Sequence, residues 1–288
     1  MTAPATTGHS TRRRRVEWPG GELAAVTIGV ALEAFDNQSQ LRLAGRPGER
    51  DSFSLSYGEY GVRVGVWRLL DLFDEYDVKA SFSVSGKLAQ EWPEVVAAVH
   101  AAGHDLVGHG WVNDVFLNQA DADAERDIIL ATLDAIEAAS GVRPQGWASP
   151  ANSSTDRTLE IMVEAGIAWS GDDASDDLPY VQPVGERALV ILPKANLASN
   201  DLVHWILPTN SPSVFAEGFT DSLSVAVEEG SAGLPQWADM VLHCHMAGRP
   251  AFLPTLRRCL DLARRTEGLW WTTKDELAGW TREKGFAR

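Results

Sequence analysis

The chain has 288 residues, 44% of them hydrophobic, and a formal charge of −15 at neutral pH. This length suits one large α/β domain or two small ones. The acidic balance argues against a nucleic-acid partner, because contact with phosphates needs a basic face. No uninterrupted apolar run approaches about 18 residues, so we expect no membrane-spanning segment.

Only two cysteines are present, Cys244 and Cys259, which is too few for a disulfide framework. A basic run near the start, Arg12 to Arg15, is followed by polar residues and glycines. It lacks the clean apolar run and small-residue cleavage site of an export signal. We therefore expect a flexible N-terminal arm over residues 1–17, a single domain over residues 18–288, and a cytoplasmic protein.

Strands and helices are predicted in alternation along the chain. Apolar residues recur at helical spacing over residues 60–76, Pro93 suits the first turn of the next helix, and Gly141 ends a third. The predicted strands cover residues 23–30, 79–84, 105–107, 145–148, 167–170, 189–193, 240–243 and 269–271. The predicted helices cover residues 60–76, 91–102, 120–140, 155–165, 214–228, 249–265 and 274–284.

About seven such alternations occur without a break in composition or a long linker. This pattern is typical of parallel strands joined by crossover helices. The number of units favours a barrel over an open sheet. We therefore predict an α/β fold, a distorted, seven-stranded (β/α) barrel whose strands all end at one face.

Polar residues follow the predicted strands at this face. Glu33 follows the first strand, His109 the third and His243 the seventh. His109 stands between Gly108 and Gly110, where a ligand can approach the imidazole closely. A lone histidine at a strand end is more often a buried, hydrogen-bonded residue. Several polar residues that converge at the carboxyl end of the predicted barrel favour a hydrolytic site instead.

Several motifs in order resemble those of the polysaccharide deacetylase (NodB-homology) superfamily, and most closely its branch that contains metal-independent allantoinases. The motifs are the helix segment 60–70, His109-Gly-Trp-Val-Asn113, Arg143-Pro-Gln-Gly-Trp147, Asp176-Asp-Leu-Pro-Tyr180, and His243 with the later Gly-Arg-Pro. The resemblance covers roughly residues 23–280. It implies a distorted (β/α) barrel that hydrolyses a carbon–nitrogen bond other than a peptide bond.

The chain departs from this superfamily at the metal site. Metal-dependent members have an Asp-Asp pair after the first strand and His-x-x-x-His after the third. Here Ala31 and Glu33 take the first pair's place, and Asn113 replaces the second histidine. The resemblance thus implies Glu33, His109 and Asn113 as the metal ligands, a poor set for zinc. We expect no required cofactor, with one divalent metal such as zinc as the alternative.

Hydrolysis of an amide needs an activated water, stabilisation of the oxyanion and an acid for the leaving nitrogen. We assign Glu33 to orient the water or hold a metal. We assign His109 to polarise the carbonyl or bind the metal. His243 is the predicted general acid, because an imidazole titrates near neutral pH.

Further residues are predicted to bind the substrate, each with an ordinary structural alternative. Arg63 could instead form a helix salt bridge, and an acidic loop residue could simply face solvent. A catalytic triad through Ser149 is disfavoured because no Gly-x-Ser-x-Gly pattern surrounds it. The predicted substrate-binding residues are Arg63, Trp111, Trp147, Ser149, Asp173 and His245.

The sequence therefore predicts a hydrolase of a small amide, ureide or cyclic imide, with a small molecule as its partner. Self-association into a homo-oligomer stays open. A second hypothesis is a metal-dependent carbohydrate N-deacetylase. A third, from another class, is a non-catalytic barrel that binds a ligand through a degenerate metal site.

Overall fold

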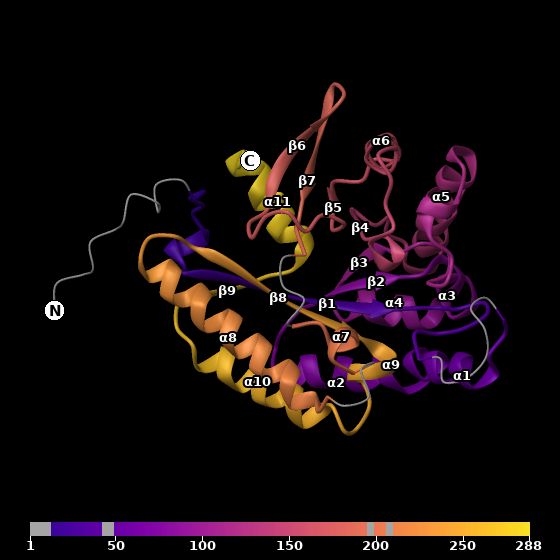
Figure 1. Cartoon of the computed structure of the whole chain (residues 1–288), viewed down its shortest axis with the longest axis horizontal. Helices are drawn as coiled ribbons and strands as arrows, with labels where there is room; N and C mark the ends of the chain where they lie inside the picture. The colour runs from indigo at the N-terminus through magenta and orange to yellow at the C-terminus, as the bar shows by residue number, and fades with distance from the viewer. Residues whose placement is uncertain (1–12, 42–48, 195–198, 206–209) are drawn as a thin grey trace.

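The computed structural model describes residues 13–41, 49–194, 199–205 and 210–288. Their strands form one curled sheet in the order β6-β7-β5-β4-β3-β2-β1-β8, and β9 also pairs with β1 (Figure 1). The strands are β1 (Ala24–Leu32), β2 (Ser81–Val84), β3 (Asp105–Gly108), β4 (Gly146–Trp147), β5 (Trp169–Ser170), β6 (Tyr180–Val184), β7 (Arg187–Ile191), β8 (Gln236–His243) and β9 (Leu269–Trp271).

All of these pairings are parallel except that of β6 with β7. Helices connect the strands, and most of them cover the convex face of the sheet (Figure 1). They are α1 (Ser52–Tyr60), α2 (Val66–Glu75), α3 (Gly86–Glu91), α4 (Pro93–Ala101), α5 (Ala122–Ser140), α6 (Thr158–Glu164), α7 (Asp201–Trp205), α8 (Pro212–Ser231), α9 (Cys244–Ala247), α10 (Leu253–Arg265) and α11 (Lys274–Lys284). The predicted distorted (β/α) barrel is confirmed, but its described sheet has nine strands rather than seven and curls into an incomplete barrel.

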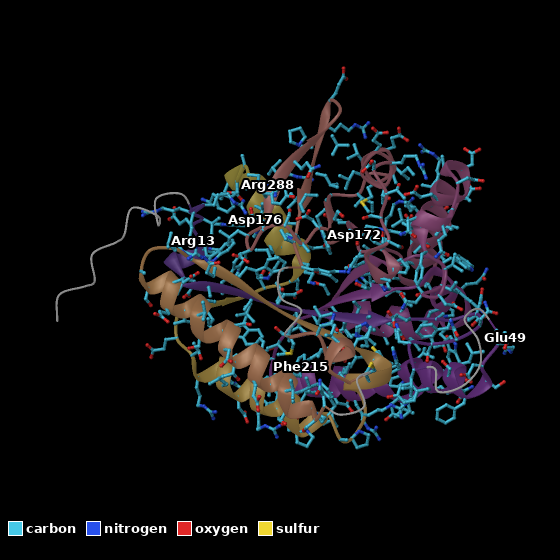
Figure 2. The ribbon with its side chains drawn as sticks, in the orientation of Figure 1. Arg13, Glu49, Asp172, Asp176, Phe215 and Arg288 are labelled. Atoms are coloured by element: carbon cyan, nitrogen blue, oxygen red, sulfur yellow. The ribbon has the colours of Figure 1, made fainter. Side chains whose placement is uncertain are left out.

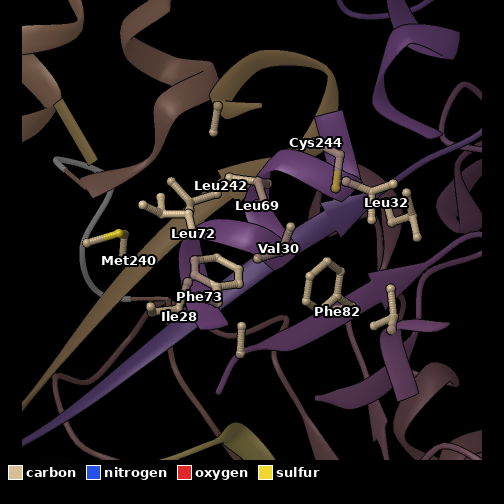
Figure 3. Close-up of a cluster of buried hydrophobic side chains, with 14 of the residues drawn as sticks. Ile28, Val30, Leu32, Leu69, Leu72, Phe73, Phe82, Met240, Leu242 and Cys244 are labelled. Atoms are coloured by element: carbon tan, nitrogen blue, oxygen red, sulfur yellow. The ribbon is translucent and has the colours of Figure 1, made fainter. Parts of the chain in front are cut away.

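The central strand β1 divides its side chains between two environments. Ile28, Val30 and Leu32 point to the outer face, where they pack against Phe73 of α2 and Phe82 of β2 (Figure 3). Successive strand residues point to opposite faces, so the intervening residues face the concave side. This outer cluster anchors α2 against the sheet through apolar burial.

The concave face of β1 carries small side chains. Thr27, Gly29 and Ala31 pair in register with Asp239, Val241 and His243 of β8, which face the same side. A Cβ atom on Gly29 would lie 2.7 Å from Lys274 Nζ, so glycine makes room for that side chain. These small residues leave an internal space below the carboxyl ends of the strands.

Several elements extend beyond the prediction, among them the short helices α3, α7 and α9, a longer first helix and an added strand. The first helix begins at Ser52 rather than Tyr60 and runs through a π-helical turn (Gly61–Gly65) into α2. Asp51 caps it by accepting hydrogen bonds from the amides of Phe53 and Ser54 at 3.1 Å each. The added strand, β6, doubles back on β7 as an antiparallel hairpin projecting from the sheet (Figure 1).

The described part of the N-terminal segment lies against the barrel. Arg13 pairs with Glu229 at 2.5 Å, and Val16 is buried. Trp18 is also buried and donates its indole N–H to Gln236 O at 2.9 Å. Residues 1–12 fall outside the described ranges. Within those ranges, no helix has both the length and the apolar character needed to cross a bilayer.

Candidate active site

Three predicted catalytic residues meet at the carboxyl edge of the sheet. Glu33 follows β1, His109 follows β3, and His243 ends β8; all three are buried. Because β1 is the neighbour of β8 and lies two strands from β3, these chain ends converge although they are far apart in sequence. The expected meeting of the three side chains is therefore observed.

The Glu33 carboxylate lies among imidazoles. Its Oε1 is 3.3 Å from His109 Nε2 and 3.8 Å from His243 Nε2. Its Oε2 lies 3.7 Å from His245 Nδ1 and accepts a hydrogen bond from Gln40 Nε2 at 2.8 Å. A buried carboxylate without such partners would be costly, so these groups keep it ionised.

The orientation of His109 follows from its hydrogen bonds. Nδ1 lies 2.5 Å from the carbonyl oxygen of Ala148, which can only accept, so Nδ1 carries a proton. Nε2 therefore either holds a second proton toward Glu33 or presents its lone pair there. In the neutral ring, whose one proton is on Nδ1, Nε2 is the nitrogen that can accept a proton beside the carboxylate.

His243 is held by a second carboxylate. Asp201 Oδ1 lies 2.6 Å from His243 Nδ1, and Asp201 Oδ2 accepts the His243 backbone N–H at 2.8 Å. Both side chains are buried. With Nδ1 protonated toward Asp201, the opposite nitrogen Nε2 points to Glu33 and can carry the proton that an acid catalyst donates.

The environment shifts the titration of these groups in opposite directions. Burial opposes ionisation of Glu33, but the imidazoles of His243, His109 and His245 outweigh it and lower its pKa to about 2. Burial also disfavours charge on His243, yet Asp201 and Glu33 raise its pKa above the ordinary value. His245 is different, because burial lowers its pKa to about 3. Glu33 is thus a permanent anion, and His243 is the histidine suited to hold a proton.

A cavity of about 210 Å³ opens beside these residues. Glu33, His109 and His243 line it, together with charged residues of β8, α11 and the segment after β7. Drug-sized ligands occupy pockets of about 300–1,000 Å³, so this cavity suits a smaller molecule. These charged residues are Lys194, Asp239 and Lys274.

Two of the six predicted substrate-binding residues lie at the site. Ser149 lines the cavity, where its Oγ donates to Asp172 Oδ2 at 2.5 Å. His245 touches Glu33 from behind and is enclosed by the rings of Phe35 and Tyr57. Its role in the structure is to support the carboxylate rather than to line the cavity.

The other four predicted substrate-binding residues do not line this cavity, which corrects the expectation. Arg63 is exposed and pairs with Glu59 one helical turn away at 2.7 Å. The other three have structural partners of their own. Trp111 packs on the backbone of α3, Trp147 is buried in the outer core, and Asp173 accepts from Ser175 in its own loop.

The sequence reasoning did not single out several residues that build the site. These residues are Lys194, which follows β7, Asp201, which begins α7, and Asp239, which lies inside β8. For two of them the signal is strand alternation: Lys194 continues the face of Val190 and Leu192, and Asp239 shares the face of His243. Figure 2 places Asp172, the partner of Ser149, near the middle of the molecule, well away from Asp176 beside the N-terminal segment.

The predicted metal ligands do not form a good zinc site. Glu33 and His109 offer preferred donors, but Asn113 adds only a neutral amide oxygen. Among the described residues, no group of three or more His, Cys, Asp or Glu side chains is arranged to hold a metal ion. Asn113 Oδ1 is buried and has no hydrogen-bond partner within the described ranges. A metal therefore has no assigned role in catalysis. The Asn113 Oδ1 atom can instead accept a hydrogen bond from an N–H group of a ligand.

The fold and the site define a (β/α)-barrel hydrolase with its polar groups at the carboxyl ends of parallel strands. A family model described as polysaccharide deacetylase matches residues 47–169. The crystal structure of PuuE allantoinase is 28% identical, covers 97% of both chains and superposes with a TM-score of 0.86. A probable polysaccharide deacetylase from Pseudomonas aeruginosa PAO1 is also 28% identical, covers 97% of this chain and 98% of its own, and gives a TM-score of 0.86.

A further relative is the peptidoglycan deacetylase of Helicobacter pylori, which is 23% identical over 88% of this chain and 94% of its own. The chain is therefore similar to polysaccharide deacetylases and to PuuE allantoinase over nearly its whole length, and its residues 47–169 match the polysaccharide deacetylase family model. It is a hydrolase of carbon–nitrogen bonds other than peptide bonds, as the motifs around His109 and His243 predicted.

Proposed function

We propose that this hydrolase acts on a small amide, ureide or cyclic imide, without a required metal. The observation that carries the proposal is the buried Glu33 carboxylate held between His109 and His243 at the wall of a small cavity. These groups supply a proton acceptor and a proton donor on the two sides of one bond. Acid–base hydrolysis of an amide needs that pair of functions.

The first step is attack of water on the substrate carbonyl. Glu33 and His109 act as a pair, since Oε1 and Nε2 lie 3.3 Å apart and can share the proton that water gives up. The new C–O bond forms as that proton moves to the pair and the carbonyl π electrons move to oxygen. The Nδ1–H bond to Ala148 fixes the ring during this transfer.

The second step is expulsion of the leaving nitrogen. His243 donates its Nε2 proton to that nitrogen as the C–N bond breaks and the carbonyl reforms. Asp201 keeps the imidazole charged and oriented, as the carboxylate of a Ser-His-Asp triad does. The proton held by Glu33 and His109 then returns to solvent, and His243 is reprotonated, so the cycle closes.

Two observations support a small substrate. The cavity volume is below that usual for drug-sized ligands. The similarity to a protein named as an allantoinase extends over nearly the whole chain. A metal-dependent carbohydrate N-deacetylase is the second candidate, supported by the peptidoglycan deacetylase relative and opposed by the weak donor set at Asn113.

The test is hydrolysis of a panel of small amides, ureides, cyclic imides and N-acetylated sugars. We expect turnover of ureides or imides and loss of about 10²–10⁴-fold in kcat for His243→Ala and Glu33→Gln. Turnover of N-acetylated sugars alone would support the deacetylase candidate. Absence of turnover on every substrate would leave the non-catalytic barrel and contradict the proposal.

A further inference from the structure

Lys194 places a cation in the cavity that the catalytic steps do not use. It follows β7 and lines the same cavity as Glu33 and His243. Its Nζ donates a hydrogen bond to Asn152 Oδ1 at 2.6 Å. In the part of the chain that the structure describes, no carboxylate oxygen lies within 4.0 Å of this ammonium.

The other charges of the cavity are already compensated. Lys274 Nζ lies 2.8 Å from Asp239 Oδ2, and Asp239 Oδ1 accepts from Thr27 Oγ1 at 2.7 Å. Glu33 is surrounded by imidazoles. A ligand that approached Lys274 would have to break an existing ion pair, whereas one that approached Lys194 would not.

Asp172, Asp239 and Glu33 attract the Lys194 ammonium electrostatically, but none of these three carboxylates forms an ion pair with it. Asp172 accepts both the backbone N–H and the hydroxyl of Ser149, at 2.7 and 2.5 Å. Desolvation lowers the pKa of Lys194, which means that its charge lacks full compensation where it lies. A bound anion would supply that compensation.

The loop that carries Asn152 is built to hold the ammonium. Ala151 and Asn152 both adopt left-handed backbone conformations, with φ of +50° and +53°. Such angles are uncommon in residues other than glycine and cluster at functional sites. Here they turn the Asn152 side chain back toward Lys194. A neutral amide oxygen positions the cation but leaves its charge available.

We propose that Lys194 binds a carboxylate of the substrate and so selects acidic amides or ureides, with the scissile bond at Glu33 and His243. The inference rests on the proposed function for the position of that bond. A carboxylate bound to an ammonium in a partly desolvated cavity gains a charge-assisted hydrogen bond. The neutral amide analogue of the same ligand does not, so the affinities of the two should differ.

The experiment compares N-carbamoylglycine with N-carbamoylglycinamide, which differ only in carboxylate against carboxamide. Calorimetry measures the affinity of the inactive Glu33→Gln protein for both. We expect about 10–100-fold tighter binding of the carboxylate. When Lys194→Met is introduced into the Glu33→Gln protein, the preference for the carboxylate should be abolished. Lys194→Arg in the same protein should retain most of that preference. Circular dichroism and thermal unfolding establish that each variant is folded.

Equal affinity of the Glu33→Gln protein for the two probes would overturn the inference. So would a preference that survives in the Lys194→Met variant, or failure of both probes to bind at millimolar concentration. Failure of the proposed function is a separate result: no turnover by wild-type protein on any panel substrate. The binding preference of the inactive protein does not depend on that result, so the two failures can be told apart.

Discussion

Asp201 Oδ1 lies 2.6 Å from His243 Nδ1, and the other oxygen of the same carboxylate holds the His243 backbone amide. The imidazole is thereby fixed in both orientation and protonation. Asp201 begins α7, while His243 ends β8, so the pair joins two segments 42 residues apart. The fold thus orients and protonates the His243 imidazole before any substrate binds.

The first prediction concerns Asp201→Asn. The carboxylate raises the pKa of His243, so activity that requires the protonated imidazole should persist below that raised pKa and fall as pH rises through it. In the variant this alkaline limb should move to lower pH. We expect kcat at neutral pH to drop by about 10²–10⁴-fold. A pH–rate profile of both proteins measures the shift.

Two comparisons control this experiment. His243→Ala should lose the alkaline limb altogether, and the double variant should be no worse than His243→Ala, because the two residues act as a unit. An alkaline limb unmoved in Asp201→Asn would mean that His243 is not the titrating acid.

The second prediction concerns acid stability. The folded-state pKa of Glu33 is about 2, below its unfolded value of 4.5, so its ionisation stabilises the fold above pH 4.5. That stability is lost as pH falls through 4.5 toward 2, and the change is about 3 kcal/mol. Glu33→Gln should be less stable than wild type at pH 7 and should lose less stability on acidification. Urea unfolding at pH 7, 4 and 3 measures this; parallel curves for the two proteins would refute it.

The third prediction concerns metal. If the neutral amide of Asn113 makes a poor ligand, extended dialysis against dipicolinate should change kcat less than about two-fold. Elemental analysis should find well below one zinc per chain. Asn113→His restores an imidazole at the second histidine position, and we expect it to raise zinc affinity. Loss of activity on dialysis, with recovery on adding zinc, would contradict the metal-free mechanism.

The three catalytic residues could be predicted because each of them follows or ends a strand. Glu33, His109 and His243 each follow an apolar run that ends abruptly, and parallel strands bring such ends together. The hairpin strand β6 and the short helix α7 gave no comparable pattern. Asp201 was therefore seen only as a polar residue after a strand, since nothing in its neighbours indicates that it would lie beneath an imidazole.

The substrate-binding residues were harder to predict, because the Arg143-Pro-Gln-Gly-Trp147 motif and the loop after it do not indicate which side chains reach the cavity. Trp147 and Ser149 are two residues apart, and the Trp147 indole N–H donates to Ser149 Oγ at 2.9 Å. The two side chains therefore lie on the same side, yet the indole is buried in the core and only Ser149 reaches the cavity. Lys194 lies just beyond β7 but keeps the strand's alternation, which is why its position could have been inferred.

The fourth prediction separates residues that line the cavity from those that do not. Arg63→Ala removes an exposed arginine paired with Glu59, so kcat/KM should change less than about two-fold. Ser149→Ala removes the hydroxyl that ties the cavity wall to Asp172, and kcat/KM should fall by about ten-fold or more. Steady-state kinetics on one substrate suffice. Equal losses for both variants would restore a binding role for Arg63.

The fifth prediction concerns a carboxyl pair at the opposite end of the barrel from Glu33. Asp105 Oδ2 accepts the Asp275 backbone N–H at 3.0 Å, and burial together with Asp105 raises the pKa of Asp275 to about 7. A folded-state pKa above the unfolded 3.8 means that ionisation costs stability, so the free energy of unfolding should fall as pH rises from 4 to 7.

Asp275→Asn removes that charge and can still accept the hydrogen bond from Trp169 Nε1. We expect the variant to be more stable than wild type at pH 8 by about 1–3 kcal/mol, allowing for partial exposure, and to match it at pH 4. The exposed Asp71→Asn is the matched control and should show no such pH-dependent gain. Urea unfolding across this range measures the difference. A gain of equal size at pH 4 and pH 8 would show that packing, rather than the charge of Asp275, limits stability at this end of the barrel.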